Sequence, residues 1–226
     1  MTARLHLAKD TGKVLFKDIN PLLATSVHAD HPIEVFVDNK DFIISIMPFS
    51  LQAIQIKNIR LDLNRISVGK GGALDAVATL LNLQHGDEMK LWFTPLYLEV
   101  RNGMIICKRV DALLDNTVQI ASWGTIDLPS DRVDMVVGVL GSGLRHSLGL
   151  QMLNHDYVLQ LPLRGTTSTA TIDKTRATAK IASLRMQEAK NETQALIGGL
   201  LGIAASVGEK EAPVPPPTTF PFPWHK

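Results

Sequence analysis

Cysteine is almost missing from this sequence, and its scarcity limits the chemistry that the chain can perform. Cys107 is the one cysteine among 226 residues. A single cysteine cannot form an internal disulfide, so the sequence neither indicates nor excludes an oxidising compartment. The surrounding run, GMIICKRV, has the pattern of a strand and supplies no base that would activate a nucleophile. We therefore expect Cys107 to be a buried, unreactive thiol.

The sequence also lacks an excess of charge of either sign. Lys and Arg number 23 and Asp and Glu number 22, which gives a formal net charge of +1. No strongly basic face is indicated, so nucleic acid is a poor candidate partner. The same balance does not favour attraction to an anionic membrane surface.

Long hydrophobic runs are missing as well. No window reaches about 18 consecutive apolar residues, so the sequence predicts no membrane-spanning helix. The opening MTARLHLAKD lacks the basic start and apolar run of a signal peptide. We expect a cytoplasmic protein if Met1 is the true start; otherwise the chain is a piece of a longer protein.

Two glycine-containing stretches fall short of known catalytic or nucleotide-binding motifs. VGKGGALDA lacks the spacing of a phosphate loop, and no Ser or Thr follows Lys70. We interpret it as a flexible connection from a strand to a helix, with contact between Lys70 and a lipid phosphate as an alternative. GSGLRH matches neither the dinucleotide fingerprint nor the nucleophile elbow. Ser142 and His146 within it have no evident carboxylate to orient them.

Metal-binding patterns are weak too. His28, Asp30 and His31 lie close together in HADHP, but their spacing is not a specific metal signature. The carboxylates are scattered, and no pair can be assigned to acid–base catalysis. We therefore expect a protein that is not an enzyme and that uses no cofactor or metal. A hydrolase based on Ser142 and His146 is the weaker alternative.

What the sequence does contain is a series of short, alternating apolar runs. Hydrophobic residues make up 45% of the chain, enough for one folded domain, with or without a tail. The runs include RLHLA, KVLFK, IEVFV, FIISIM, MKLWF, LYLEV, MIICKRV and VQIASW. Their period of two predicts strands. We expect a mainly β protein with helices, of the α+β class, whose curved antiparallel sheet occupies residues 1–172.

The stretch 53–68 alternates in a way that an undistorted strand cannot accommodate. Its apolar residues change parity twice, from Ile54 and Ile56, to Ile59, Leu61 and Leu63, and then to Ile66 and Val68. A strand keeps side chains on one face only at a period of two, so each change requires a bulge, a bend or a break. Such irregularities are typical of strongly curved sheets.

Helical spacing is found in two places. Residues 71–84 predict a short helix, with one apolar face formed by Leu74, Val77, Leu80 and Leu81. Residues 173–208 predict a long C-terminal helix, in which Gly198 and Gly202 would allow close approach of protein or of a second helix in a membrane. The tail 209–226 is proline-rich, and we expect it to be extended or disordered.

The best-patterned strands lie between residues 123 and 165. In RVDMVVGV and DYVLQLPLRG, alternate apolar residues define one face of each strand. Pro162 favours an edge position or a strand end. The apolar face would form either an ordinary closed core or an open groove that holds lipid tails. Its residues are Val133, Met135, Val137, Val139, Tyr157, Leu159 and Leu161.

These strands resemble the C-terminal region of AsmA-like proteins of the bacterial envelope. The resemblance covers residues 90–185: a strand pair around LYLEVRNGMI, the hairpin WGTIDLPSDRVDMVVGV, a strand that ends in PLRG, and the element TID before a helix. It implies a curled β-sheet with an apolar groove that conducts phospholipids. It also implies a role in outer-membrane lipid transport or assembly, with membrane or envelope proteins as partners.

The resemblance leaves two functional interpretations open. In the first, the chain is a non-catalytic protein that binds phospholipid or another apolar ligand, on the periplasmic face of the envelope if it is a fragment of an anchored protein. Because strand-like sequence follows Met1 directly, we expect the chain to be either a C-terminal fragment of such an anchored protein or a short relative of the family. In the second, the sheet is a structural module that docks a partner by strand pairing and holds no lipid.

Overall fold

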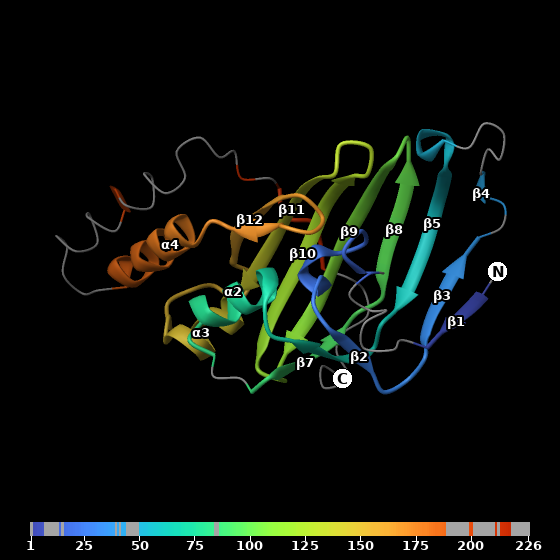
Figure 1. Ribbon diagram of the computed structural model, residues 1–226. Helices are drawn as coiled ribbons and strands as arrows, with labels where there is room; N and C mark the ends of the chain where they lie inside the picture. The colour runs from blue at the N-terminus through green and yellow to red at the C-terminus, as the bar shows by residue number, and fades with distance from the viewer. Residues whose placement is uncertain are drawn as a thin grey trace.

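The chain forms a broad, open antiparallel sheet with helices packed on one of its faces (Figure 1). The structure is a computed structural model. It describes residues 2–6, 14, 16–38, 40, 42–43, 50–83, 86–188, 199–200, 211 and 213–217. The expected α+β class and antiparallel sheet are confirmed over these residues.

Within the described ranges the sheet contains 13 strands, and every strand pair is antiparallel. The longest path runs in the order β1-β3-β5-β8-β9-β10-β11-β12-β13. The strands are β1 (Thr2–Leu5), β2 (Val27–Ala29), β3 (Ile33–Val37), β4 (Phe42–Ile43), β5 (Gln55–Asp62), β6 (Arg65–Gly69), β7 (Glu88–Phe93), β8 (Leu96–Arg101), β9 (Met104–Leu114), β10 (Val118–Asp127), β11 (Arg132–Leu140), β12 (Val158–Gly165) and β13 (Thr171–Ile172).

The sheet divides into two branches at β9. The first half of β9 pairs with β8, from which the sheet continues to β5, β3 and β1. The second half pairs with β7, from which a shorter branch continues to β6 and β2. Thr94 lies between β7 and β8, where the two branches meet. It is bound to β9 there, because its backbone N–H donates to the Asp111 carbonyl at 2.9 Å.

The two parity changes in residues 53–68 mark two irregularities in the structure. The pairing of β5 with β8 shifts register between Ile56 and Ile59, as expected for a bulge. The chain then breaks at Leu63 and Asn64, where Asn64 has a φ of 51°. After this break β6 joins the other branch of the sheet. Of the bulge, bend or break expected at each parity change, the structure has a bulge at the first and a break at the second.

Helices cover one face of the sheet, which we call the core face. They are the 3-10 turn η1 (Pro21–Leu23), α2 (Gly72–Leu80), α3 (Gly141–Leu148) and α4 (Lys174–Gln187), and α2 lies in front of the sheet in Figure 1. A further 3-10 turn, η3 (Leu51–Ala53), precedes β5. The short helix expected over 71–84 is therefore present as α2, slightly shorter than predicted.

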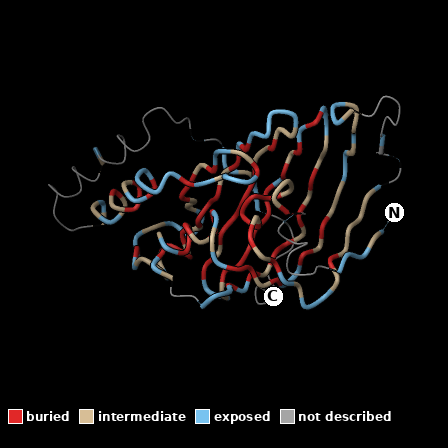
Figure 2. Tube along the Cα trace, in the orientation of Figure 1, coloured by how far each residue is buried: buried red, intermediate tan, exposed pale blue. Residues whose placement is uncertain are grey.

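The apolar core lies between these helices and the strands (Figure 2). Leu74 and Val77 of α2, Leu144 of α3 and Ile181 of α4 belong to the same buried cluster as the apolar residues of β11. Helix α4 begins where the Asp173 side chain accepts a hydrogen bond from the Arg176 N–H at 3.0 Å.

The long C-terminal helix predicted over residues 173–208 is not confirmed. Helix α4 ends at Gln187, and residues 199–200 are also helical. Gly198, Gly202 and the other residues of the predicted segment 173–208 lie outside the described residues. Of the tail 209–226, the structure describes Glu211 and residues 213–217, which form neither helix nor strand.

Candidate functional site on the outer face of the sheet

The seven residues proposed from the sequence as groove lining lie on the core face. Val133, Met135, Val137 and Val139 are 0% exposed, and Leu159 and Leu161 are 2% exposed. Tyr157 is partly buried against the same cluster, and burial raises the pKa of its hydroxyl. This arrangement is that of the closed core, the first of the two alternatives. A ligand would reach these side chains only if the helices moved away.

The opposite face, which we call the outer face, carries an open cavity. Its lining side chains come from three adjacent strands: Tyr97 of β8, Ile106 and Lys108 of β9, and Trp123 and Thr125 of β10. Residues 215–217 of the tail form another wall. The volume is about 620 Å³, within the range of roughly 300–1,000 Å³ that is typical of small-molecule sites. We call it the Trp123 cavity.

A bulge between β9 and β10 places the Trp123 side chain. Ser122 pairs with Val110 and Gly124 pairs with Cys107, so two residues of β9 lie opposite Trp123 alone. Gly124 has a φ of 138°, and a Cβ there would lie 2.4 Å from the Asp134 carbonyl oxygen. The bulge therefore requires glycine at position 124.

The Trp123 ring lies over a second glycine. A Cβ at Gly138 on β11 would lie 3.0 and 3.1 Å from two carbons of the ring, and 2.6 Å from Val158 on β12. The missing side chain at position 138 thus makes the space that the indole occupies. Trp123 is 6% exposed, and its buried Nε1–H has no acceptor among the described residues. A buried donor without a partner is unusual in a folded protein.

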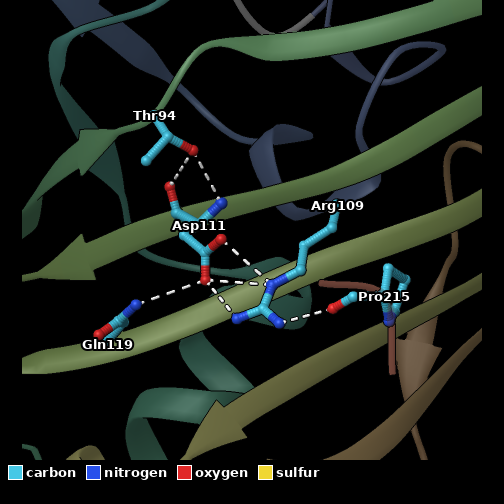
Figure 3. Close-up of polar contacts among 5 residues, drawn as sticks. All are labelled: Thr94, Arg109, Asp111, Gln119 and Pro215. Carbon is cyan, nitrogen blue, oxygen red and sulfur yellow. Dashed lines mark hydrogen bonds and ion pairs between the residues drawn. The ribbon is translucent and has the colours of Figure 1, made fainter. Parts of the chain in front are cut away.

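A buried ion pair, Arg109 with Asp111, lies beside the cavity, which Arg109 also lines. Figure 3 shows its polar contacts. The same bulge turns Arg109 and Asp111 to the outer face. The Arg109 Nη2 and Nε donate to Asp111 Oδ1 at 2.7 Å and Oδ2 at 3.1 Å. Gln119 donates to the same carboxylate at 3.4 Å. Thr94 exchanges hydrogen bonds with the Asp111 backbone at 3.0 and 3.1 Å, which fixes the pair at the fork of the sheet.

The third nitrogen of the Arg109 guanidinium, Nη1, contacts the tail. Its Nη1 donates to the Pro215 carbonyl at 2.7 Å, across a separation of 106 residues (Figure 3). Glu211, four residues earlier, accepts from the Lys180 Nζ of α4 at 3.2 Å. The tail is therefore held at two points, to Arg109 on the outer face and to Lys180 on α4.

A second cavity lies on the other side of this contact. It has a volume of about 710 Å³ and shares Arg109 and residues 215–217 with the first cavity. Leu113, Leu140 and Val158 supply apolar walls. We call it the Leu113 cavity. The tail segment separates the two cavities along the outer face.

The structure also shows where the other candidate residues from the sequence lie and what they contact. Cys107 is 3% exposed, its thiol donates to the Ile19 carbonyl at 3.2 Å, and burial raises its pKa to about 12. Lys70 pairs with the exposed Asp87 at 3.2 Å. Ser142 lines the Leu113 cavity and His146 is exposed, but no hydrogen bond between them is found in the described part of the chain.

The neighbouring motifs also have local explanations. His28 lies 3.7 Å from Asp30, and the described residues contain no cluster of three or more metal-ligating side chains. In GSGLRH, a Cβ at Gly143 would meet Val118 of β10 at 2.8 Å, so this glycine allows α3 to lie close to the sheet.

Sequence reasoning missed Arg109, Asp111 and Trp123 as site residues. Both charged residues stand inside a run that otherwise reads as a buried strand, KRVDALL. An Arg and an Asp in such a run must pair to be tolerated, and this signal was available. The bulge and the return of the tail were not visible in the local sequence.

Comparisons with known proteins add no assignment: no protein-family model, curated protein or solved structure matches this chain. The resemblance to AsmA-like proteins therefore stays a prediction from the residues quoted for it. A search of the described helices for one that is long and apolar enough to cross a bilayer found none.

Proposed function

We propose that this protein is a non-catalytic binding module for an amphiphilic molecule, with phospholipid as the ligand class. The observation that carries the proposal is the Trp123 cavity. It combines apolar side chains with an exposed cation at its rim. The AsmA-like resemblance supports the choice of phospholipid, and the proposed site lies on the outer face instead of the core face.

The chemistry of the cavity suits an acyl chain. Ile106, Tyr97 and Trp123 present apolar surface, and residues 215–217 add the rings of three prolines. Apolar walls with few polar groups are typical of sites that enclose a hydrophobic ligand. Burial of an acyl chain would be favourable by about 0.8 kcal/mol for each methylene that leaves water.

The rim of the cavity suits a headgroup. Lys108 is exposed and lines the cavity, next to the buried Arg109. An ammonium group can pair with a phosphate oxygen while the acyl chain lies against Trp123.

Native mass spectrometry of the full chain after exposure to phospholipid tests this proposal. We expect a retained phospholipid that is lost in Ile106→Asp, because a carboxylate would replace part of the apolar wall. Lys57→Asp is a matched control, since Lys57 is exposed on β5 and does not line the cavity. Retention by the Ile106 variant, or no uptake by the unaltered chain, would contradict the proposal.

A further inference from the structure

We propose that Arg109, Asp111 and Trp123 form a recognition site for an extended, proline-rich peptide segment, and that residues 213–217 are its occupant within the same chain. This inference does not depend on phospholipid binding. It rests on the contacts of the tail with the outer face and on the chemistry of those contacts.

The Arg109 guanidinium is prepared for a carbonyl acceptor. Asp111 takes the Nε and Nη2 donors, and the Asp111 side chain is itself held by Gln119. The pair is buried, with side-chain exposures of 6% and 3%. The remaining Nη1 points at the Pro215 carbonyl. A fixed fork that keeps one donor free for a ligand is a property of arginine and not of lysine.

A proline-rich segment is well matched to such a donor. Proline has no backbone N–H and fixes φ, so the segment forms no helix and its carbonyls stay available as acceptors. It also loses little conformational entropy when it binds, as in other aromatic-lined grooves that take such peptides. Here Trp123 and Tyr97 are the aromatic residues that line the cavity against Pro215 and its neighbours.

Glu211 adds a second element of recognition. Lys180 is 7% exposed, and its ammonium donates to the Gln160 carbonyl at 3.1 Å and to the Glu211 carboxylate at 3.2 Å. The Glu211 carboxylate also raises the pKa of Tyr157 beyond the effect of burial. The site therefore recognises an acidic residue four positions before the proline whose carbonyl it binds.

The tail segment contacts the sheet as a bound peptide would, and its residues are not packed into the core. Pro215 is half-buried, whereas residues 213, 216 and 217 are exposed and Val214 is 39% exposed. None of residues 213–217 is among the buried residues of the core cluster, and residues 215–217 form a wall of both the Trp123 and the Leu113 cavity. The occupant is thus able to exchange with an equivalent peptide while the sheet stays folded.

Competition with a synthetic peptide tests the inference. A variant of the full-length protein, which we call the opened chain, has an altered tail segment. It carries the five substitutions Pro213→Gly, Val214→Ser, Pro215→Gly, Pro216→Ser and Pro217→Gly. A fluorescent peptide EAPVPPP, the sequence of residues 211–217, is titrated into it, and anisotropy reports binding. We expect saturable binding to the opened chain and at least about tenfold weaker binding to the unaltered chain, whose site is occupied.

Matched variants of the opened chain identify the contact. Arg109→Lys should weaken peptide binding about tenfold, because the lysine cannot pair with Asp111 and donate to the carbonyl at once. Arg60→Lys is the control, since Arg60 makes the same type of pair with Asp62 and has no tail contact among the described residues. In an opened chain that also carries Glu211→Gln, a peptide with glutamine in place of glutamate should bind about threefold more weakly.

A second measurement keeps the test valid if the opened chain does not fold. Val214→Cys in the otherwise unaltered chain is labelled with a spin probe, since Cys107 is buried. We expect the probe to be more mobile with Arg109→Lys than with Arg60→Lys. The inference is overturned if a folded opened chain does not bind the peptide, or if the two lysine variants behave alike in either experiment.

Discussion

Met135 and Asp134 are neighbours on β11, but they point to opposite faces of the sheet and have opposite surroundings. Met135 is 0% exposed in a core that includes residues of α2, α3 and α4. Asp134 is exposed, and its carboxylate pairs with Arg164 of β12 at 2.6 Å. The core face is closed by the chain itself, whereas the outer face combines ion pairs with two open cavities. Buried residues on the core face thus contribute to stability, whereas we propose that those on the outer face contribute to binding.

The largest expected effect is a loss of stability when a charge is placed on the core face. Met135→Asp places a carboxylate among apolar side chains, and we expect a loss of at least about 4 kcal/mol in the free energy of unfolding. Ile106→Asp on the outer face should cost about 1 kcal/mol, because its side chain is only partly buried. Urea unfolding measures both. Similar losses for the two variants would remove the distinction between the faces.

The next effect compares two ion pairs on the outer face. Arg60 and Asp62 have side-chain exposures of 40% and 13%, and Arg60 also lies 5.0 Å from the Phe36 ring centroid. We expect Asp111→Ala to cost about 3–5 kcal/mol, because it leaves the buried Arg109 charge without its carboxylate. Asp62→Ala should cost about 0–1 kcal/mol.

Denaturant unfolding of these two alanine variants checks the difference. The unaltered chain and the double variants Arg60→Ala/Asp62→Ala and Arg109→Leu/Asp111→Leu serve as references. Replacement of both buried partners should be much less costly than Asp111→Ala, because no charge is left unpaired. Equal costs for Asp111→Ala and Asp62→Ala would contradict the assignment of the Arg109 pair as buried.

A smaller effect concerns the space beneath Trp123. Gly138→Ala brings a methyl group within 3.0 Å of the indole and 2.6 Å of Val158, so we expect a loss of about 1–3 kcal/mol. Thermal unfolding and the tryptophan emission spectrum report the change. Gly86→Ala is the control, because none of the described residues has an atom within 4 Å of a Cβ at Gly86. An unchanged melting temperature and spectrum in the Gly138 variant would argue against this position of the indole.

The smallest effect is the pH response of Cys107. Burial raises the pKa of the folded thiol to about 12, from an ordinary value of 9.0. The neutral thiol therefore favours the folded state below pH 9, and this contribution is lost as the pH rises towards 12. We expect no reaction with iodoacetamide at pH 8 until the chain is unfolded in urea. Rapid alkylation of the folded chain would show that the core face is open at β9.

The sequence predicted the sheet well because its signal is local. Alternation at a period of two predicted the strands, and the parity changes between Ile56 and Ile66 predicted two irregularities, which are a bulge and a break in the structure. The apolar face of β11 was found in the same way, although its residues proved to be core. A period of two identifies the apolar face but not what covers it, and helices that lie far away in the sequence provide that cover here.

The site was less predictable because it depends on distant segments. Trp123 and Arg109 come together through a bulge that needs Gly124, and a single glycine in a strand has several possible explanations. The Arg109 contact with Pro215 joins residues 106 positions apart. Proline content predicted an extended tail, but only the fold shows which surface the tail meets.

The most direct test of phospholipid binding on the outer face is fluorescence quenching of Trp123. Trp92→Phe and Trp224→Phe leave Trp123 as the single tryptophan, and phospholipid with brominated acyl chains is added to the full chain. We predict strong quenching of Trp123 by bound lipid, and its loss when Ile106→Asp is added. Quenching that persists in the Ile106 variant, or none in a chain that retains phospholipid, would contradict the assignment of the Trp123 cavity as the lipid site.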